Sequence, residues 1–116
     1  MSFKYQSIPL EKRKKESETL LTKYPERVPI IVEIDPKGGF PPLDKCKYLP
    51  ARDMTMGQFV YTIVRRLQIG PEKACFLFIN NKLFGTETLI GDIYKTEKQS
   101  DGFLYCYIRA EETFGG

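Results

Sequence analysis

The sequence predicts an α+β fold in a single domain, and three features of the chain support this. A length of 116 residues is typical of one domain. The side chains of residues 28–34 and 102–108 divide into two alternating sets, which is the period of a strand. Between these segments, the apolar residues of 55–68 recur with the period of an α-helix.

The first expected element is an N-terminal helix that is entered within residues 7–11 and runs to about Lys23. Pro9 lies within this entry, and proline is favoured near the first turn of a helix. The Tyr24-Pro25 step ends it, because the residue before a proline disfavours the helical conformation. Its apolar stripe is thin and consists of Leu10, Leu20, Leu21 and Tyr24. We therefore expect this helix to be stable only when it packs against a larger unit.

A strand follows over residues 28–34, and both of its faces carry apolar residues. The face with Val28, Ile30 and Val32 is the natural core face. The other face begins with Pro29 and Ile31 and needs a cover, which either the N-terminal helix or a ligand could supply. Residues 35–42 are rich in glycine and proline and predict a loop, and a short second strand follows at 47–49. Together the two strands predict an antiparallel hairpin.

The next helix is expected over residues 55–68. Thr55 and Gln58 have the spacing of a capping box at its start. The core stripe is expected to be Met56, Val60, Ile63 and Leu67, with Phe59, Thr62 and Arg66 on a neighbouring stripe.

The last third of the chain predicts three short elements, a strong final strand and a tail. We expect a strand at 75–79, a turn at Asn80-Asn81, a short return strand at 82–83, one or two helical turns at 89–94, a strand at 102–108 and a free tail over 110–116. A hairpin, a helix that crosses the sheet and further strands make up the order of the ubiquitin-like β-grasp fold. Cys75 and Cys106 fall within strands, where a cysteine usually fills the core.

The composition argues against an enzyme. The chain has no histidine, which excludes Ser-His and Cys-His nucleophile pairs and metal sites that use histidine. Its three cysteines, which lie far apart, form no Cys-x-x-Cys pair, and no glycine-rich phosphate loop is present. We therefore expect no metal and no cofactor, and the composition favours a binding or modifier domain.

The net charge lies at the N-terminus. Residues 1–24 contain six basic and three acidic side chains, and the rest of the chain is neutral. The run from Lys12 to Lys15 is either a solvated helix face or a contact surface for acidic lipid, acidic peptide or microtubules. Nucleic acid is disfavoured, because no aromatic residues lie among the basic ones. No signal peptide and no membrane span is expected, and three cysteines without a secretory context indicate a reducing compartment.

The chain ends in Gly115-Gly116, and two glycines there contribute nothing to a fold. A glycine-ended tail is thin enough to enter the narrow active site of an enzyme that activates its carboxylate. A cloning scar or a truncation is the alternative explanation.

Several sequence blocks resemble the autophagy-related protein 8 family, which includes GABARAP and microtubule-associated-protein light chain 3. They occur in family order along the whole chain and include 23–33 (Lys-Tyr-Pro-Glu-Arg-Val-Pro-Ile-Ile-Val-Glu), 43–49 (Leu-Asp-Lys-Cys-Lys-Tyr-Leu), 57–59 (Gly-Gln-Phe), 78–81 (Phe-Ile-Asn-Asn), 101–105 (Asp-Gly-Phe-Leu-Tyr) and the closing Phe114-Gly115. The resemblance implies a ubiquitin-like β-grasp with two N-terminal helices added. The expected regions are a helical extension at 1–24, a β-grasp core at 25–109 and a conjugation tail at 110–116.

The resemblance also implies a function. A cysteine protease would cut between Gly115 and Gly116, and enzymes similar to the ubiquitin-activating and ubiquitin-conjugating enzymes would join Gly115 to phosphatidylethanolamine. The protein would be cytoplasmic before lipidation. Once lipidated, it would lie on the autophagosome membrane and act in autophagosome formation. It would also recruit cargo receptors that carry an aromatic-x-x-aliphatic motif. The alternative is a soluble adaptor, never lipidated, that binds peptides or tubulin. Gly116 could instead be the acceptor itself, or the chain could have been cut there.

The motif peptide would add to the second strand, which is expected to be an open edge. By resemblance, the first pocket, which would take the aromatic residue, consists of Leu20, Pro29, Ile31, Lys47, Leu49 and Phe103, flanked by Glu16 and Arg27. The second pocket, which would take the aliphatic residue, consists of Tyr48, Met54, Phe59, Thr62 and Arg66. Lys45, Lys47 and Arg66 would attract acidic residues beside the motif. We expect Pro29 and Ile31 to be partly buried and to contact the ligand, because the helix stripe is too thin to cover both. The sequence departs from the family pattern near the second pocket, at residues 50–52 and at Thr62.

Overall fold

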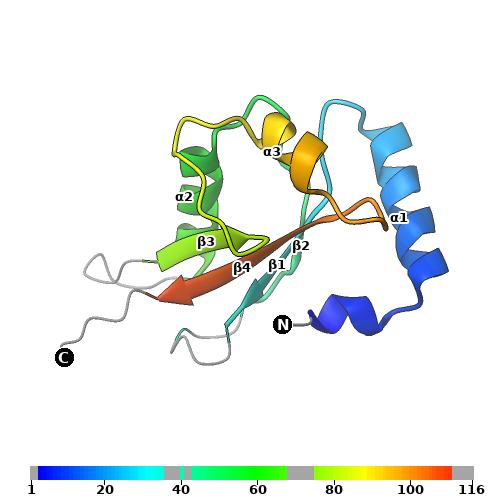
Figure 1. Cartoon of the computed structure of the whole chain (residues 1–116), viewed down its shortest axis with the longest axis horizontal. Coiled ribbons are helices and arrows are strands. Elements are labelled where there is room, and N and C mark those ends of the chain that lie inside the picture. The colour runs from blue at the N-terminus through cyan, green and yellow to red at the C-terminus, as the bar shows by residue number, and fades with distance from the viewer. Residues whose placement is uncertain (1–2, 36–39, 41–42, 68–74, 111–116) are drawn as a thin grey trace.

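The computed structural model describes residues 3–35, 40, 43–67 and 75–110. Residue 110 is described in its backbone alone. These residues form an α+β fold, in which a four-stranded sheet has helices on both faces (Figure 1). The elements are η1 (Lys4–Ser7, a 3-10 helix), α1 (Leu10–Lys23), β1 (Ile30–Ile34), β2 (Lys47–Tyr48), α2 (Met56–Leu67), β3 (Cys75–Ile79), α3 (Ile90–Glu97) and β4 (Leu104–Ala110).

The first and last strands are neighbours in the sheet, whose order is β2-β1-β4-β3. β1 pairs with β2 in antiparallel fashion, as predicted for the hairpin, and with β4 in parallel, with Ile30 opposite Leu104. β3 and β4 are antiparallel. The two edges of the sheet among the described residues are therefore β2 and β3.

The main core lies between the sheet and α2. Val28, Ile30 and Val32 face it, as predicted, and so do Leu104, Cys106 and Ile108 of β4. The capping box of α2 is confirmed: the Gln58 side chain accepts from the Thr55 N–H at 2.9 Å, and the Thr55 hydroxyl oxygen accepts from the Gln58 N–H at 3.2 Å.

The predicted core stripe of α2 is wrong at one position. Phe59 is only 2% exposed and lies in the core with Met56 and Ile63, whereas Val60 is only partly buried. Phe59 and Val60 follow Met56 by three and four positions, so both lie near the helix face of Met56. The larger side chain, Phe59, takes the central place in the core.

A second, smaller cluster covers the opposite face of the sheet. Residues of η1 and α1 pack there on β1 and β4; the cluster consists of Tyr5, Ile31, Phe103 and Tyr105, with Phe3, Ile8 and Leu20 against it. The helix α1 begins within the predicted entry at 7–11 and ends at Lys23, but its predicted stripe is only half correct, because Leu10 and Tyr24 are 42% and 38% exposed.

Polar contacts complete the attachment of α1. Ser17 is 1% exposed and donates from its hydroxyl to the carbonyl of Asp101 at 2.5 Å. The Arg13 guanidinium donates to the Asp101 carboxylate at 2.6 Å, and the Tyr105 hydroxyl donates to the same oxygen at 2.5 Å. The Arg13–Asp101 hydrogen bond raises the pKa of Arg13. Gly102, beside this carboxylate, has φ of +89°.

Several predicted element boundaries need correction; β1 begins at Ile30 and not at residue 28, and β4 begins at Leu104 and not at residue 102. Asn80 and Asn81 have positive φ and form the expected turn, but the return strand at 82–83 is only one bridge, between Ile79 and Lys82. The helix predicted at 89–94 extends to Glu97, and the last strand continues to Ala110, where the tail was expected to begin.

None of the described helices has both the length and the apolar character that a bilayer span requires.

Candidate functional site

The predicted peptide edge, β2, presents alternate backbone groups inward and outward. The carbonyls of Cys46 and Pro50 accept from the N–H groups of Val32 and Val28, at 2.8 and 3.1 Å. The backbone of Lys47, which lies between them, therefore points away from β1. Pro50 stands at an inward position, so its missing N–H removes no donor from the outer side.

Two outward carbonyls of this edge are already engaged by side chains. The Arg27 guanidinium donates to the carbonyl of Leu49 at 2.7 Å, and the Tyr48 hydroxyl donates to the carbonyl of Lys45 at 2.8 Å. Within the described residues, the N–H and C=O of Lys47 and the N–H of Leu49 are left for a partner strand. A peptide could thus make about three backbone hydrogen bonds here.

The residues of the predicted first pocket gather on the outer face of β1, but they are more deeply buried than expected. Ile31 and Phe103 are both 0% exposed, and Pro29 is buried too. The prediction that Pro29 and Ile31 remain partly exposed is wrong, because it counted only the stripe of α1. The aromatic residues Tyr5 and Phe3, which precede α1, supply the missing cover.

Tyr5 connects the polar residues of the first pocket. Its hydroxyl donates to the Glu16 carboxylate, and its ring lies edge-on to that of Phe103, with centroids 5.2 Å apart. The Lys47 ammonium lies 5.6 Å from the centroid of the Tyr5 ring and 2.5 Å from Glu16. Burial and the bond to Glu16 raise the pKa of Tyr5. Burial also opposes the ionisation of Glu16, but the bonds from Lys47 and Tyr5 outweigh it and lower the pKa of Glu16.

The N-terminal segment that carries Tyr5 is held by Glu33 of β1. The two carboxylate oxygens of Glu33 accept from the backbone N–H groups of Lys4 and Tyr5, at 2.9 and 3.0 Å. A carboxylate at the start of a helical turn satisfies donors that have no partner within the turn.

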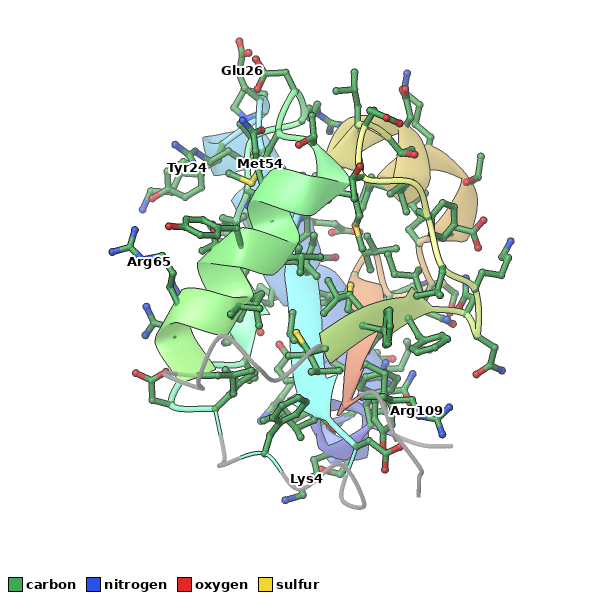
Figure 2. All side chains as sticks on the ribbon, turned by 90° about the vertical axis from the view of Figure 1, so that its left-hand side faces the viewer. Lys4, Tyr24, Glu26, Met54, Arg65 and Arg109 are labelled. Carbon is green, nitrogen blue, oxygen red and sulfur yellow. The ribbon has the colours of Figure 1, made fainter. Side chains whose placement is uncertain are left out.

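The residues of the predicted second pocket lie between β2 and α2. Tyr48 and Phe59 are buried edge-to-face, with centroids 5.9 Å apart, and Met54 packs on the core beside the first turn of α2 (Figure 2). Thr62 is exposed, and its hydroxyl donates to the Gln58 carbonyl at 3.0 Å.

Arg66 is not a free cation at this pocket. It donates two hydrogen bonds to the carboxylate of Asp44, at 3.3 and 2.9 Å. A surface hollow of about 330 Å³ lies beside it on α2, lined by Tyr61, Thr62, Arg65 and Arg66. In Figure 2 the side chain of Arg65 projects away from the helix. Lys45 is also engaged, since its ammonium lies 5.1 Å from the centroid of the Tyr48 ring.

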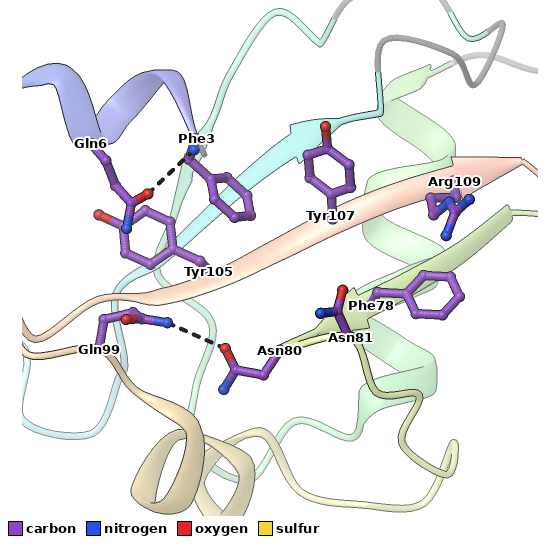
Figure 3. A pocket seen from close by; sticks show the side chains of 9 residues that line it. All are labelled: Phe3, Gln6, Phe78, Asn80, Asn81, Gln99, Tyr105, Tyr107 and Arg109. Atoms are coloured by element: carbon purple, nitrogen blue, oxygen red, sulfur yellow. Dashed lines mark hydrogen bonds between the residues drawn. The ribbon is translucent and has the colours of Figure 1, made fainter. Parts of the chain in front are cut away.

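One hollow of about 330 Å³ lies outside both predicted pockets, on the outer face of β3 and β4 (Figure 3). Aromatic side chains form one part of its wall and amide side chains another: the lining residues are Phe3, Gln6, Phe78, Asn80, Asn81, Gln99, Tyr105, Tyr107 and Arg109. The Gln99 amide donates to Asn80 at 3.2 Å. The sequence analysis did not find this hollow, because the residues come from four separate segments.

Two of the described cysteines, Cys75 and Cys106, lie within strands, where burial raises the pKa of both thiols. Cys106 is fully buried, as predicted, and its burial raises the pKa of its thiol. Cys75 is only partly buried, with its pKa raised for the same reason. Among the described residues, no cluster of acidic or cysteine side chains has the arrangement of a metal site. Gly115 and Gly116 lie outside the described residues.

Comparison with known proteins identifies the chain's relatives. The family described as "Autophagy protein Atg8 ubiquitin like" matches residues 12–115. Autophagy-related protein 8b of Arabidopsis thaliana is 50% identical over 115 residues, which are 99% of this chain and 93% of that protein. Autophagy-related protein 8 of Kluyveromyces marxianus is 47% identical over 109 residues, 94% of this chain and 88% of that one. The crystal structure of Trypanosoma brucei ATG8 has a TM-score of 0.91 at 35% identity and covers 99% of this chain and 100% of its own. The chain therefore belongs to the autophagy-related protein 8 family of ubiquitin-like proteins.

Proposed function

We propose that the protein is a conjugated modifier that also binds short peptides along the edge of β2. The open backbone of Lys47 is the observation that carries the peptide site, because an edge strand with free donors and acceptors can accept a further strand. The first and second pockets lie on either side of this edge and would hold the aromatic and the aliphatic residue of the motif. Cargo receptors with an aromatic-x-x-aliphatic motif are the proposed partners.

An NMR titration tests this site. A peptide with two glutamates before Trp-x-x-Leu should shift the backbone amides of residues 47–49 and bind at roughly micromolar strength. Leu49→Ala should weaken binding about tenfold, because the peptide loses its apolar contact with the partly buried side chain of Leu49. Lys45→Ala is the matched control and should change it less, because Lys45 is exposed and its charge is screened. The absence of saturable shifts at 47–49 would refute the site.

We propose conjugation through Gly115, after removal of Gly116 by a cysteine protease. Enzymes similar to those of ubiquitin transfer would activate the Gly115 carboxylate and pass it to phosphatidylethanolamine, which places the protein on autophagosome membranes. The Gly-Gly end and the family membership support this proposal, because a residue without a side chain fits a narrow catalytic channel.

A reconstituted reaction with liposomes tests the chemistry. Gly115→Ala should block trimming and lipidation while leaving peptide binding intact, and deletion of Gly116 should bypass the protease. If the Gly116 deletion abolishes lipidation and Gly115→Ala does not, the acceptor is Gly116. If neither change matters, the protein is a soluble adaptor for peptides or tubulin and is not a modifier.

A further inference from the structure

Tyr5 lies within the group of residues that forms the proposed first pocket. Its ring contacts that of Phe103 edge-on, at 5.2 Å between centroids, and lies beneath the ammonium of Lys47 at 5.6 Å. Its hydroxyl donates to Glu16. Ile31 and Leu20 belong to the same apolar cluster. The pocket that would take an aromatic ring from a partner thus already surrounds an aromatic ring of the protein itself.

The exposure values show that the apolar surface of this pocket is covered, and Tyr5 belongs to the cluster that covers it. Ile31 and Phe103 are 0% exposed, and Tyr5 itself is only 8% exposed. The ring of a peptide cannot contact either apolar residue while these surfaces are covered. We propose that Tyr5 occupies the first pocket in the absence of peptide, and that the aromatic side chain of a bound motif displaces it. This inference rests on the proposed function of the β2 edge.

The contacts of the N-terminal segment allow such a movement without unfolding. Glu33 holds the backbone N–H groups of Lys4 and Tyr5, so the backbone stays attached while the Tyr5 side chain rotates. The side chains that bind Tyr5 from above, Lys47 and Glu16, are partly exposed to solvent. After displacement, water can solvate Glu16, and the ammonium of Lys47 can pair with an acidic residue of the peptide.

Displacement makes Tyr5 a residue that determines specificity. A side chain that enters the pocket must gain more than the contacts that Tyr5 loses, which favours the large ring of tryptophan over smaller residues. The same competition lowers the apparent affinity for every peptide by the fraction of molecules in which the pocket is open. Removing the Tyr5 ring should therefore strengthen binding and reduce the preference for tryptophan over phenylalanine.

Titration calorimetry on the full chain tests the inference. The probe is a peptide with two glutamates before Trp-x-x-Leu, with a second peptide that has Phe in place of Trp. Tyr5→Ala should bind the Trp peptide about tenfold more tightly than the unmodified protein. Tyr24→Ala is the matched control, because Tyr24 is an exposed tyrosine outside the apolar cluster that contains Tyr5. The affinity of this variant for the Trp peptide should be unchanged. Equal or weaker binding by Tyr5→Ala would overturn the role of Tyr5 and leave the peptide site standing.

A measurement on the unmodified sequence covers the case in which Tyr5→Ala does not fold. The protein is labelled with 3-fluorotyrosine, and the Tyr5 resonance is assigned from its absence in Tyr5→Phe. Saturation with the Trp peptide should move this resonance to the position of a solvent-exposed tyrosine. An unchanged Tyr5 resonance at saturation would refute the displacement alone. If the peptide binds neither the unmodified protein nor any variant, the proposed peptide site fails and the role of Tyr5 fails with it.

Discussion

Replacement of Gly102 by alanine should destabilise the fold through the contact between α1 and the sheet. Gly102 has φ of +89°, which L-residues with a side chain rarely adopt. An ideal Cβ there would lie 2.3 Å from the Ser17 hydroxyl oxygen and 3.0 Å from the Ser17 Cβ. Ser17 is buried and its hydroxyl donates to the Asp101 carbonyl, so it cannot move away without losing this bond.

The magnitude follows from two costs. A side chain in the left-handed region costs about 1–2 kcal/mol. Displacing the Ser17 hydroxyl from its buried acceptor costs about 1–3 kcal/mol. We therefore expect Gly102→Ala to lower the free energy of unfolding by about 3 kcal/mol, a large part of the roughly 5–15 kcal/mol typical of a domain. The corresponding fall in Tm is about 10 °C.

Urea unfolding of a double-mutant cycle measures both costs. Ser17→Ala removes the atom nearest to the added Cβ, so Gly102→Ala should cost about 1 kcal/mol less in that background than in the unmodified protein. The backbone part of the cost should remain. A loss below about 0.5 kcal/mol for Gly102→Ala alone, or a cycle without coupling, would show that α1 adjusts freely and that the reasoning is wrong.

Two further predictions concern pH and charge. Burial and the hydrogen bonds to Glu16 and Asp101 raise the pKa of Tyr5 and Tyr105, whereas both hydroxyls ionise near the ordinary value of 10.0 in the unfolded chain. The stability from these tyrosines is present below pH 10 and lost above it, by about 1.4 kcal/mol per pH unit for each. Urea unfolding from pH 9 to 11.5 should show this fall, and a variant with phenylalanine at both positions should show a shallower one, because the buried Cys106 thiol still contributes; equal slopes would contradict the assignment. Replacing the exposed lysines 12, 14 and 15 of α1 by glutamine should weaken binding to anionic vesicles and reduce its salt dependence without changing Tm. Vesicle sedimentation measures this, and unchanged salt-sensitive binding would place the contact elsewhere.

The elements of this fold are predictable from the sequence because their signals are local. The capping box of Thr55 and Gln58 and the alternation of β4 each lie within a few residues, and the structure contains both. The lengths of short elements are less predictable. The bounds of α3 and the single bridge at Lys82 depend on hydrogen bonds to segments that local patterns do not reveal.

The closed state of the first pocket could not be predicted from the sequence. Local patterns place Ile31 on the outer face, but its cover comes from Tyr5 and Phe3, which lie in a distant segment. The salt bridge of Arg13 with Asp101 joins residues that are 88 positions apart, and a run of basic residues gives no sign that one of them is committed to such a pair. Family resemblance supplied the candidate pocket residues, whereas it carried no information about what covers them in the unliganded chain.

The parallel pairing of β1 with β4 has a consequence for how the protein is made. Because β4 lies between β1 and β3, the sheet lacks its central strand until the ribosome has synthesised Leu104 and the residues after it. Closing so long a loop is slow compared with forming local contacts. A nascent chain that stops before this strand therefore exposes the core residues of β1 and α2 as one apolar surface, which chaperones and proteases recognise. Quality control would in this way remove incomplete chains before any of them could present the β2 edge to a partner.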